Sequence, residues 1–214
     1  MIKRKSCWPC LWTMLLLCSV FIGLPATAWA TSSTDPVGDF LATYPGPHNA
    51  DLDVILVDVL FDGVNFNLHA IMNGAIGTTP GAIYVWGVDR GAGTVGFPTM
   101  APGVIFDRVV VLNNNDTSAL AGVTVTHSGN TIDAVVPLSL AAMASTGFTP
   151  ENYTWNLWPR NPPAAAGNLA ITDFAPDNSN IRVTFVPEPS SLVLLVLGVL
   201  GVAGFRRRHD SLTS

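Results

Sequence analysis

Apolar and polar residues alternate along most of the middle of the chain, which is the pattern of half-buried β-strands. The alternation is clearest on the two sides of Asp62-Gly63, a dipeptide that favours a tight turn, and it predicts a β-hairpin there. The turn at residues 127–130 predicts a second hairpin. The expected strands cover residues 55–61, 64–70, 82–88, 104–112, 122–127, 131–136, 153–158 and 181–185.

Helical patterns are scarce between these strands, and only Leu138–Ala144 favours a short helix. A parallel α/β sheet needs amphipathic helices of about 10 to 15 residues between its strands, and the sequence contains none. Clusters of Gly, Pro, Asn and Asp, such as residues 177–180, provide turns instead. We therefore expect an all-β fold, a single antiparallel β-sandwich.

Four segments of the expected sandwich are rich in acidic or aromatic residues. They are Asp35–Phe40, Asp51–Val54, Tyr84–Gly87 and Tyr153–Trp158. In spacing and residue composition they resemble sandwich modules of the DOMON and family-9 carbohydrate-binding type. The resemblance implies a jelly-roll or DOMON-like sandwich with a sugar ligand, or with haem as in some DOMON members.

The first 30 residues have the order of a secretory signal peptide. Basic residues at positions 3–5 precede an apolar stretch from Leu11 to Leu24, and Ala28 and Ala30 are the small residues that signal peptidase needs before a cut at Thr31. We therefore expect the Sec translocon and signal peptidase as partners. All three cysteines precede this cut, at positions 7, 10 and 18, so the mature domain would contain no disulfide.

The last 29 residues, 186–214, form a second targeting segment. The residues Pro187, Glu188 and Pro189 come before an apolar run, Leu192–Phe205, which Arg206, Arg207 and Arg208 follow directly. A helix of 14 residues is about 21 Å long, whereas a bilayer core of about 30 Å asks for about 20 residues. The arginines predict a cytoplasmic end, which places the rest of the chain outside. We expect a single membrane helix over about residues 190–205 that is inserted only transiently.

This order of elements resembles the PEP-CTERM sorting signal of Gram-negative bacteria that export polysaccharide. The resemblance implies that an exosortase, a membrane cysteine transpeptidase, recognises Pro187, Glu188 and Pro189 and removes the helix and the arginines. It covers only the tail. It implies an exported protein that passes through an inner-membrane intermediate to the outer envelope or extracellular matrix. We therefore divide the chain into a signal peptide (1–30), an ectodomain (31–185) and a sorting tail (186–214).

The charge of the expected ectodomain limits its ligands. It contains no lysine, and its only basic residues apart from histidine are Arg90, Arg108, Arg160 and Arg182, against thirteen acidic residues. Such a surface repels nucleic acid and anionic lipid, and it is compatible with divalent cations or neutral sugars. We therefore expect no nucleic-acid partner.

Four aspartates near the start of the domain, Asp35, Asp39, Asp51 and Asp53, are candidate calcium ligands. Calcium takes six to eight oxygen ligands, and acidic loops supply them. The alternative is that these carboxylates cap turns and charge an edge strand, since the spacing matches no EF-hand or nonapeptide calcium motif.

Three tryptophans, Trp86, Trp155 and Trp158, are candidate sugar-binding residues, because an exposed flat ring stacks well on a sugar. Trp155 and Trp158 are three positions apart, so they face opposite sides of a strand and one of them can meet a ligand. The alternative is that Trp155 lies in the core and the loop after Trp158 covers that residue, because aromatic residues dominate sandwich cores.

Three functions remain open at this point. The leading hypothesis is a non-enzymatic envelope or matrix protein that binds a glycan, for example an exopolysaccharide, since the sequence has no G-x-S-x-G or H-E-x-x-H motif. The second is a structural or adhesive surface protein that calcium stabilises. The third is a secreted hydrolase that uses two of Asp89, Asp107 and Asp133.

Overall fold

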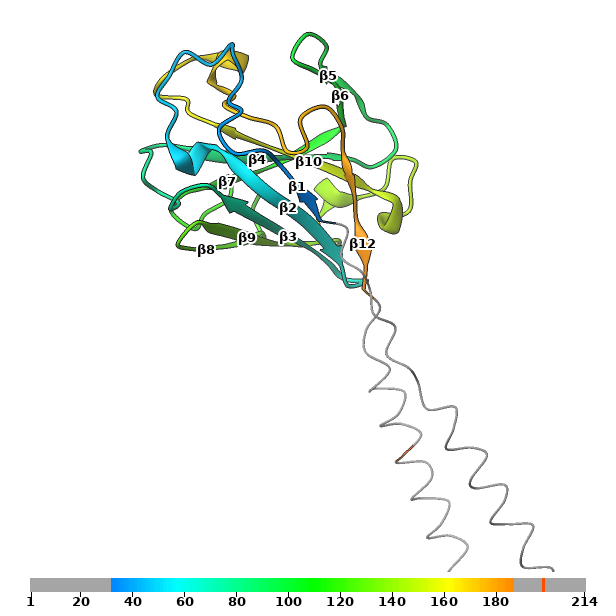
Figure 1. Cartoon of the computed structure of the whole chain (residues 1–214). Helices are drawn as coiled ribbons and strands as arrows, with labels where there is room; N and C mark the ends of the chain where they lie inside the picture. Colours follow the sequence, from blue (N-terminus) through cyan, green and yellow to red (C-terminus); the bar gives the residue numbers. More distant parts are fainter. Residues whose placement is uncertain (1–31, 187–197, 199–214) are drawn as a thin grey trace, which may run out of the picture. The chain divides into compact units, whose positions relative to one another are not determined.

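A computed structural model of the chain describes residues 32–186 and Gly198 (Figure 1). Among these residues, no helix is long and apolar enough to cross a membrane. The expected signal peptide, with Ala28 and Ala30, lies outside the described residues. So do Pro187, Glu188, Pro189 and the three arginines at 206–208, together with all of the expected sorting helix except Gly198.

Two sheets make up most of the described domain (Figure 1). We call the first sheet A, in the order β1-β2-β3-β9-β8, with β12 also paired to β2. Its strands are β1 (Ser33–Thr34), β2 (Val54–Phe61), β3 (Asn65–Met72), β8 (Thr124–Ser128), β9 (Thr131–Pro137) and β12 (Thr184–Phe185). Sheet B has the order β11-β10-β4-β7. Its strands are β4 (Ile83–Asp89), β7 (Arg108–Asn113), β10 (Thr154–Arg160) and β11 (Ile181–Arg182).

The remaining elements are short. A separate hairpin joins β5 (Thr94–Phe97) to β6 (Ala101–Phe106). Four 3-10 turns are η1 (Ala50–Leu52), η2 (Ala141–Met143), η3 (Pro150–Asn152) and η4 (Gly167–Ala170). All strand pairs are antiparallel except β12 with β2, so the prediction of an all-β, antiparallel fold is confirmed for the described residues.

Both predicted hairpins form, as β2–β3 and β8–β9. Three local predictions need correction. The expected strand at 104–112 is two strands that break at Asp107, whose carboxylate accepts hydrogen bonds from Arg90 and Ala92. The expected strand at 181–185 changes sheets after Arg182, where the N–H of Val183 donates to Tyr153. The expected helix at 138–144 is only the three-residue turn η2.

The main core lies between sheet A and sheet B. Inward residues of β2, β3 and β9 pack with those of β4, β7 and β10 in one buried cluster. Phe66 of β3 lies with its ring 5.4 Å from the rings of both Tyr153 and Trp155, so aromatic contacts join the sheets directly. The alternation read from the sequence therefore marks the faces that the two sheets turn toward each other.

The opposite face of sheet B carries a second, smaller core under the β5–β6 hairpin. Trp158 packs there against the rings of Phe97, Phe106 and Phe174, at centroid distances of 5.0 to 6.2 Å. Gly87 lies under the indole. A side-chain carbon at this position would be 2.5 Å from the Trp158 ring, so the close packing requires glycine here. Sheet B is therefore covered on both faces, which leaves none of its tryptophans at the surface.

Both ends of the described domain lie along the same edge of β2 (Figure 1). Ser33 of β1 is opposite Val57, and Thr184 of β12 is opposite Leu60. The two short strands thus cover the backbone groups that β2 would otherwise expose, as sheet edges usually require. This arrangement also brings the segment after β1 close to the segment that leads into β11.

Candidate metal centre

Four aspartates from the two ends of the domain converge in one cluster. Asp35 and Asp39 follow β1, and Asp173 and Asp177 precede β11. We call these four residues the acidic cluster. Two long-range hydrogen bonds hold the segments in place: Leu41 N–H donates to the carbonyl oxygen of Thr172 (2.9 Å), and Val54 N–H donates to Asp173 Oδ2 (2.9 Å).

The geometry of the acidic cluster fits a single ion. One carboxylate oxygen from each aspartate lies within 4.8 Å of the others. Oxygens bound to one calcium at 2.3–2.6 Å can be about 5 Å apart at most, and those bound to magnesium at 2.0–2.1 Å about 4 Å. Carboxylate oxygens without nitrogen or sulfur are the ligands of a hard cation. The donor set therefore fits calcium, and backbone carbonyls or water would complete its coordination.

Several oxygens at this place have no partner. Asp35 Oδ2 and Asp39 Oδ1 are shielded from solvent, yet neither makes a hydrogen bond within the described part of the chain. Asp53 is buried beside the cluster, and its Oδ1 also makes no hydrogen bond within the described residues. Its Oδ2 accepts hydrogen bonds from Gly38 N–H (2.9 Å) and from the side-chain amide of Asn73 (2.9 Å). Unpartnered, desolvated carboxylates are costly, because burial without compensation disfavours the charge.

Among residues 32–186, no cationic side chain forms an ion pair with the acidic cluster. The ion pairs of the described residues are Arg90–Asp107, His69–Asp133 and His127–Asp116, and none of them includes a member of the acidic cluster. Asp173 is only 1% exposed and its two oxygens accept from the N–H groups of Val54 and Phe174. Backbone donors therefore orient Asp173, but no ion pair within residues 32–186 neutralises its charge.

Burial and mutual repulsion change the acidity of these groups in the same direction. Burial raises the pKa of Asp35 to about 8, and repulsion from Asp39, Asp177 and Asp53 adds to this effect. Burial likewise raises the pKa of Asp173 to about 8, although the N–H of Val54 opposes the shift. The pKa of Asp39 is raised as well, again by burial first. Without a cation, the site favours protonated carboxyls.

Of the four aspartates proposed as calcium ligands from the sequence, the structure places two in the acidic cluster. Asp35 and Asp39 join the acidic cluster, and Asp53 borders it. Asp51 lies elsewhere, fully buried, and accepts hydrogen bonds from the N–H and hydroxyl of Thr79 (2.7 and 2.5 Å), which is the turn-capping alternative. The sequence reasoning missed Asp173 and interpreted Asp177 as part of a turn, because only the pairing of distant segments brings them to Asp35.

All three candidate tryptophans are buried. Trp86 and Trp155 lie in the main core, and Trp158, 2% exposed, lies in the second core. Trp155 and Trp158 do face opposite sides of β10, but the β5–β6 hairpin covers the side on which a ligand was expected. None of the three rings therefore offers an open face for a sugar.

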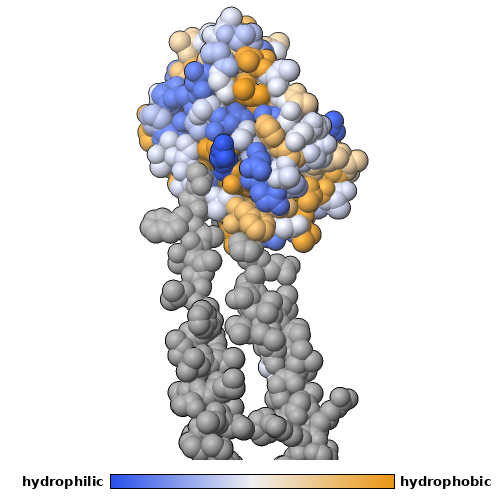
Figure 2. Space-filling model, turned by 90° about the vertical axis from the view of Figure 1, so that its right-hand side faces the viewer, coloured by the Kyte–Doolittle hydropathy of each residue, from blue (hydrophilic) through white to orange (hydrophobic). Residues whose placement is uncertain are grey.

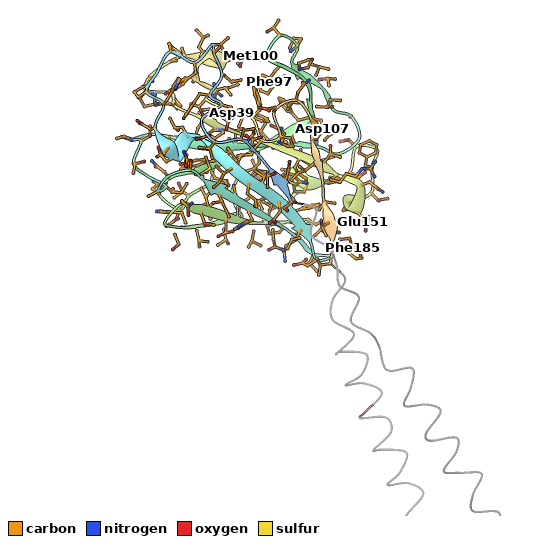
Figure 3. All side chains as sticks on the ribbon, viewed as in Figure 1. Asp39, Phe97, Met100, Asp107, Glu151 and Phe185 are labelled. Carbon is orange, nitrogen blue, oxygen red and sulfur yellow. The ribbon has the colours of Figure 1, made fainter. Side chains whose placement is uncertain are left out.

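The three aspartates considered for hydrolysis lie in two places. Asp107 is paired with Arg90 (2.8 Å), and Asp89 accepts from the N–H groups of Gly91 and Gly93, so both hold the turn after β4. Asp133 lies on β9 of sheet A, where its Oδ1 is 2.6 Å from His69 Nδ1. Figure 3 shows that Asp107 and Asp39 are also well separated.

The comparison with known families concerns the end of the chain. Residues 185–208 match the PEP-CTERM protein-sorting motif. The chain carries a PEP-CTERM sorting motif. The match includes Pro187, Glu188, Pro189 and the arginines 206–208, on which the sequence resemblance rests. The motif implies an exported protein that passes through a membrane and is processed by an exosortase. No curated protein matches the chain.

The acidic cluster predicts an unusual dependence of stability on pH in the absence of metal. Aspartates ionise near pH 4 in an unfolded chain, whereas folding raises the pKa of Asp35 and Asp173 to about 8. The stabilisation from their protonated forms is complete below pH 4 and is lost as the pH rises through 8. In chelator, the melting temperature should therefore be lower at pH 8 than at pH 5. An Asp35→Asn variant should show a smaller fall, and a melting temperature that rises from pH 5 to pH 8 would contradict the prediction.

Proposed function

We propose that this PEP-CTERM protein is a non-enzymatic component of the cell envelope or extracellular matrix, and that calcium completes its β-domain after export. The sorting motif supports the exported, exosortase-processed character. The observation that carries the calcium assignment is the acidic cluster, in which buried carboxylate oxygens of Asp35 and Asp39 lack any partner among the described residues.

The position of the acidic cluster suggests what a bound ion does. Asp35 and Asp39 belong to the first described segment, and Asp173 and Asp177 belong to the segment before the last two strands. An ion held by all four ties the two ends of the domain together. Extracellular modules bind calcium with dissociation constants of about 10⁻⁴ to 10⁻³ M, so such a site fills where calcium is abundant. The domain is then fully stable only at its destination.

Calcium should raise the melting temperature of the exported protein at pH 7.5 and above. A ligand at a hundred times its dissociation constant stabilises by about 2.7 kcal/mol, which corresponds to a rise of about 5–10 °C for a domain of this size. Asp35→Asn and Asp177→Asn should abolish most of this rise, and neither variant should lower the melting temperature measured in chelator, because each removes a repelling charge.

The matched control for these variants is Glu151→Gln, which removes one negative charge from the exposed turn η3. This variant should keep the full response to calcium. Equal melting temperatures in chelator and in calcium at a hundred times the dissociation constants of extracellular modules, about 10–100 mM, would remove the calcium assignment. A response that Glu151→Gln loses to the same extent as Asp35→Asn would reduce it to a general effect of charge.

The sorting assignment has a separate test. Replacing Pro187, Glu188 and Pro189 with alanines should leave an unprocessed, membrane-associated precursor in a host that has an exosortase, because the recognition element is gone. Alanines at Ser211, Leu212 and Thr213, which lie beyond the matched residues 185–208, provide a control of equal size that should be processed normally. Immunoblots of membrane and secreted fractions give the readout, and normal release of the first variant would contradict the assignment.

A second candidate function is the binding of a neutral glycan, and a hollow on the outer face of sheet A favours it. The hollow is about 460 Å³, within the range of small-molecule sites. Its lining comes from four neighbouring strands in two cross-strand rows. One row is Asp58, His69, Asp133 and Thr126, and the other is Leu60, Asn67, Val135 and Thr124.

The polar groups in this hollow suit hydroxyl-rich ligands. The carboxylates accept hydrogen bonds, while the amide and threonine hydroxyls both donate and accept. Asp58, Thr124 and Thr126 make no side-chain hydrogen bond to the described residues, so their capacity is open to a ligand, and partial burial raises the pKa of Asp58. The likeness of the sequence to DOMON and family-9 carbohydrate-binding modules favours the same class of ligand.

Retention of the exported protein on an immobilised uncharged glucan tests this second candidate. Asp133→Ala should weaken retention roughly tenfold, since hydrogen bonds to charged groups contribute about 1.5–3 kcal/mol. Glu151→Gln is again the control that should bind normally. No retention of the unaltered protein, or retention of Asp133→Ala at the unaltered level, would remove the candidate.

A further inference from the structure

The last strand of the domain and the start of the sorting motif share a residue. The motif covers residues 185–208, and β12 consists of Thr184–Phe185. The next residue is also bound to the sheet, because Val186 N–H donates to the carbonyl oxygen of Phe61 (2.8 Å). In the sequence, Pro187 follows immediately. The recognition element therefore begins directly after Val186, with no spacer.

β12 is a two-residue strand at the edge of β2. β12 pairs with the edge of β2 over two positions, Thr184 opposite Leu60 and Phe185 opposite Phe61. Thr184 is buried, but the Phe185 side chain is 44% exposed, with its ring 5.9 Å from that of Phe61. Figure 3 shows Phe185 at the end of the domain where the described chain stops. A two-residue strand at a sheet edge is among the segments that open most easily.

The residues before β12 are held much more firmly. Val183 is buried in the main core, and its N–H donates to the carbonyl oxygen of Tyr153 (3.2 Å). Further back, β11 pairs with β10 through Ile181 and Arg182. Asp173 and Asp177 of the acidic cluster precede β11, so this pairing separates them from β12 along the chain. The segment that lies beyond this anchor, at the edge of β2, is therefore Thr184–Val186.

A processing enzyme requires more room than the bound form of this segment provides. Enzymes that take a peptide in extended form bind several consecutive residues through their main chain, and Pro187-Glu188-Pro189 favours an extended conformation. With Val186 bound to β2, the sheet itself occupies the residues just before this element. Three released residues add about 10 Å of extended chain.

We propose that exosortase acts on a form of the protein in which β12 has left β2, so that Thr184–Val186 become part of the extended substrate. This inference rests on the proposed sorting function and adds a requirement to it. The fold then controls processing, because the apparent rate falls in proportion to the fraction of molecules in the released form. The enzyme meets a substrate whose length is set by the anchor at Val183.

The test is an insertion of Gly-Ser-Gly-Ser between Val186 and Pro187, compared with the same insertion after Arg208. The first insertion supplies a spacer and should speed processing about fivefold or more in a pulse-chase experiment in an exosortase-containing host. The second should leave the rate unchanged. Equal rates for the unaltered protein and the first insertion would overturn the proposal.

A disulfide across the edge provides the reverse test. The residues 32–186 contain no cysteine, so Leu60→Cys with Thr184→Cys creates a single pair at opposed positions. The oxidised form should be processed more slowly than its reduced form, and the Gly-Ser-Gly-Ser spacer should restore the rate. Oxidised protein processed at the full rate would contradict the proposal. Where thiol labelling shows both cysteines free, the insertion pair alone decides.

The two proposals fail in distinguishable ways. Normal processing of the triple alanine variant at 187–189 removes the sorting function, and with it this inference. Processing that depends on Pro187-Glu188-Pro189 but responds neither to the spacer nor to the disulfide removes only the requirement that β12 be released.

Discussion

The stability of the domain depends on how the negative charge at the junction of its two ends is neutralised. Pairing of β1 with β2 and of β10 with β11 brings Asp35 and Asp39 against Asp173 and Asp177, where their oxygens lie within 4.8 Å of one another. Four ionised carboxylates at this distance repel strongly in a partly buried place. The fold therefore needs either protons or a cation here, and at neutral pH and above the cation is the more effective partner.

The composition of the domain explains why no side chain fills this role. Residues 32–186 contain four arginines and no lysine, and Arg90 is already bound to Asp107 and to the carbonyl oxygens of Ala142 and Ala144. Aromatic residues hold the rest of the domain together, in one core between the sheets and another under the β5–β6 hairpin. The surface is mixed, with polar and apolar residues interspersed on the face that Figure 2 shows.

Local patterns predicted the local structure well. Period-two alternation on both sides of Asp62-Gly63 and of Gly129-Asn130 was enough to place both hairpins, because a hairpin depends only on neighbouring residues. Features that depend on distant pairing were not predictable. The change of sheet at Val183, the cover over Trp158 and the approach of Asp173 to Asp35 all arise from contacts between segments far apart in the sequence. The sorting motif was recognisable because its order of residues is itself the signal.

A crystal structure of the exported protein, grown at neutral pH with calcium, would test the role of the acidic cluster without intermediate steps. We predict one ion bound by Asp35, Asp39, Asp173 and Asp177, with metal–oxygen distances of about 2.3–2.6 Å. A well-ordered acidic cluster that holds only water and shared protons at millimolar calcium would contradict the calcium assignment.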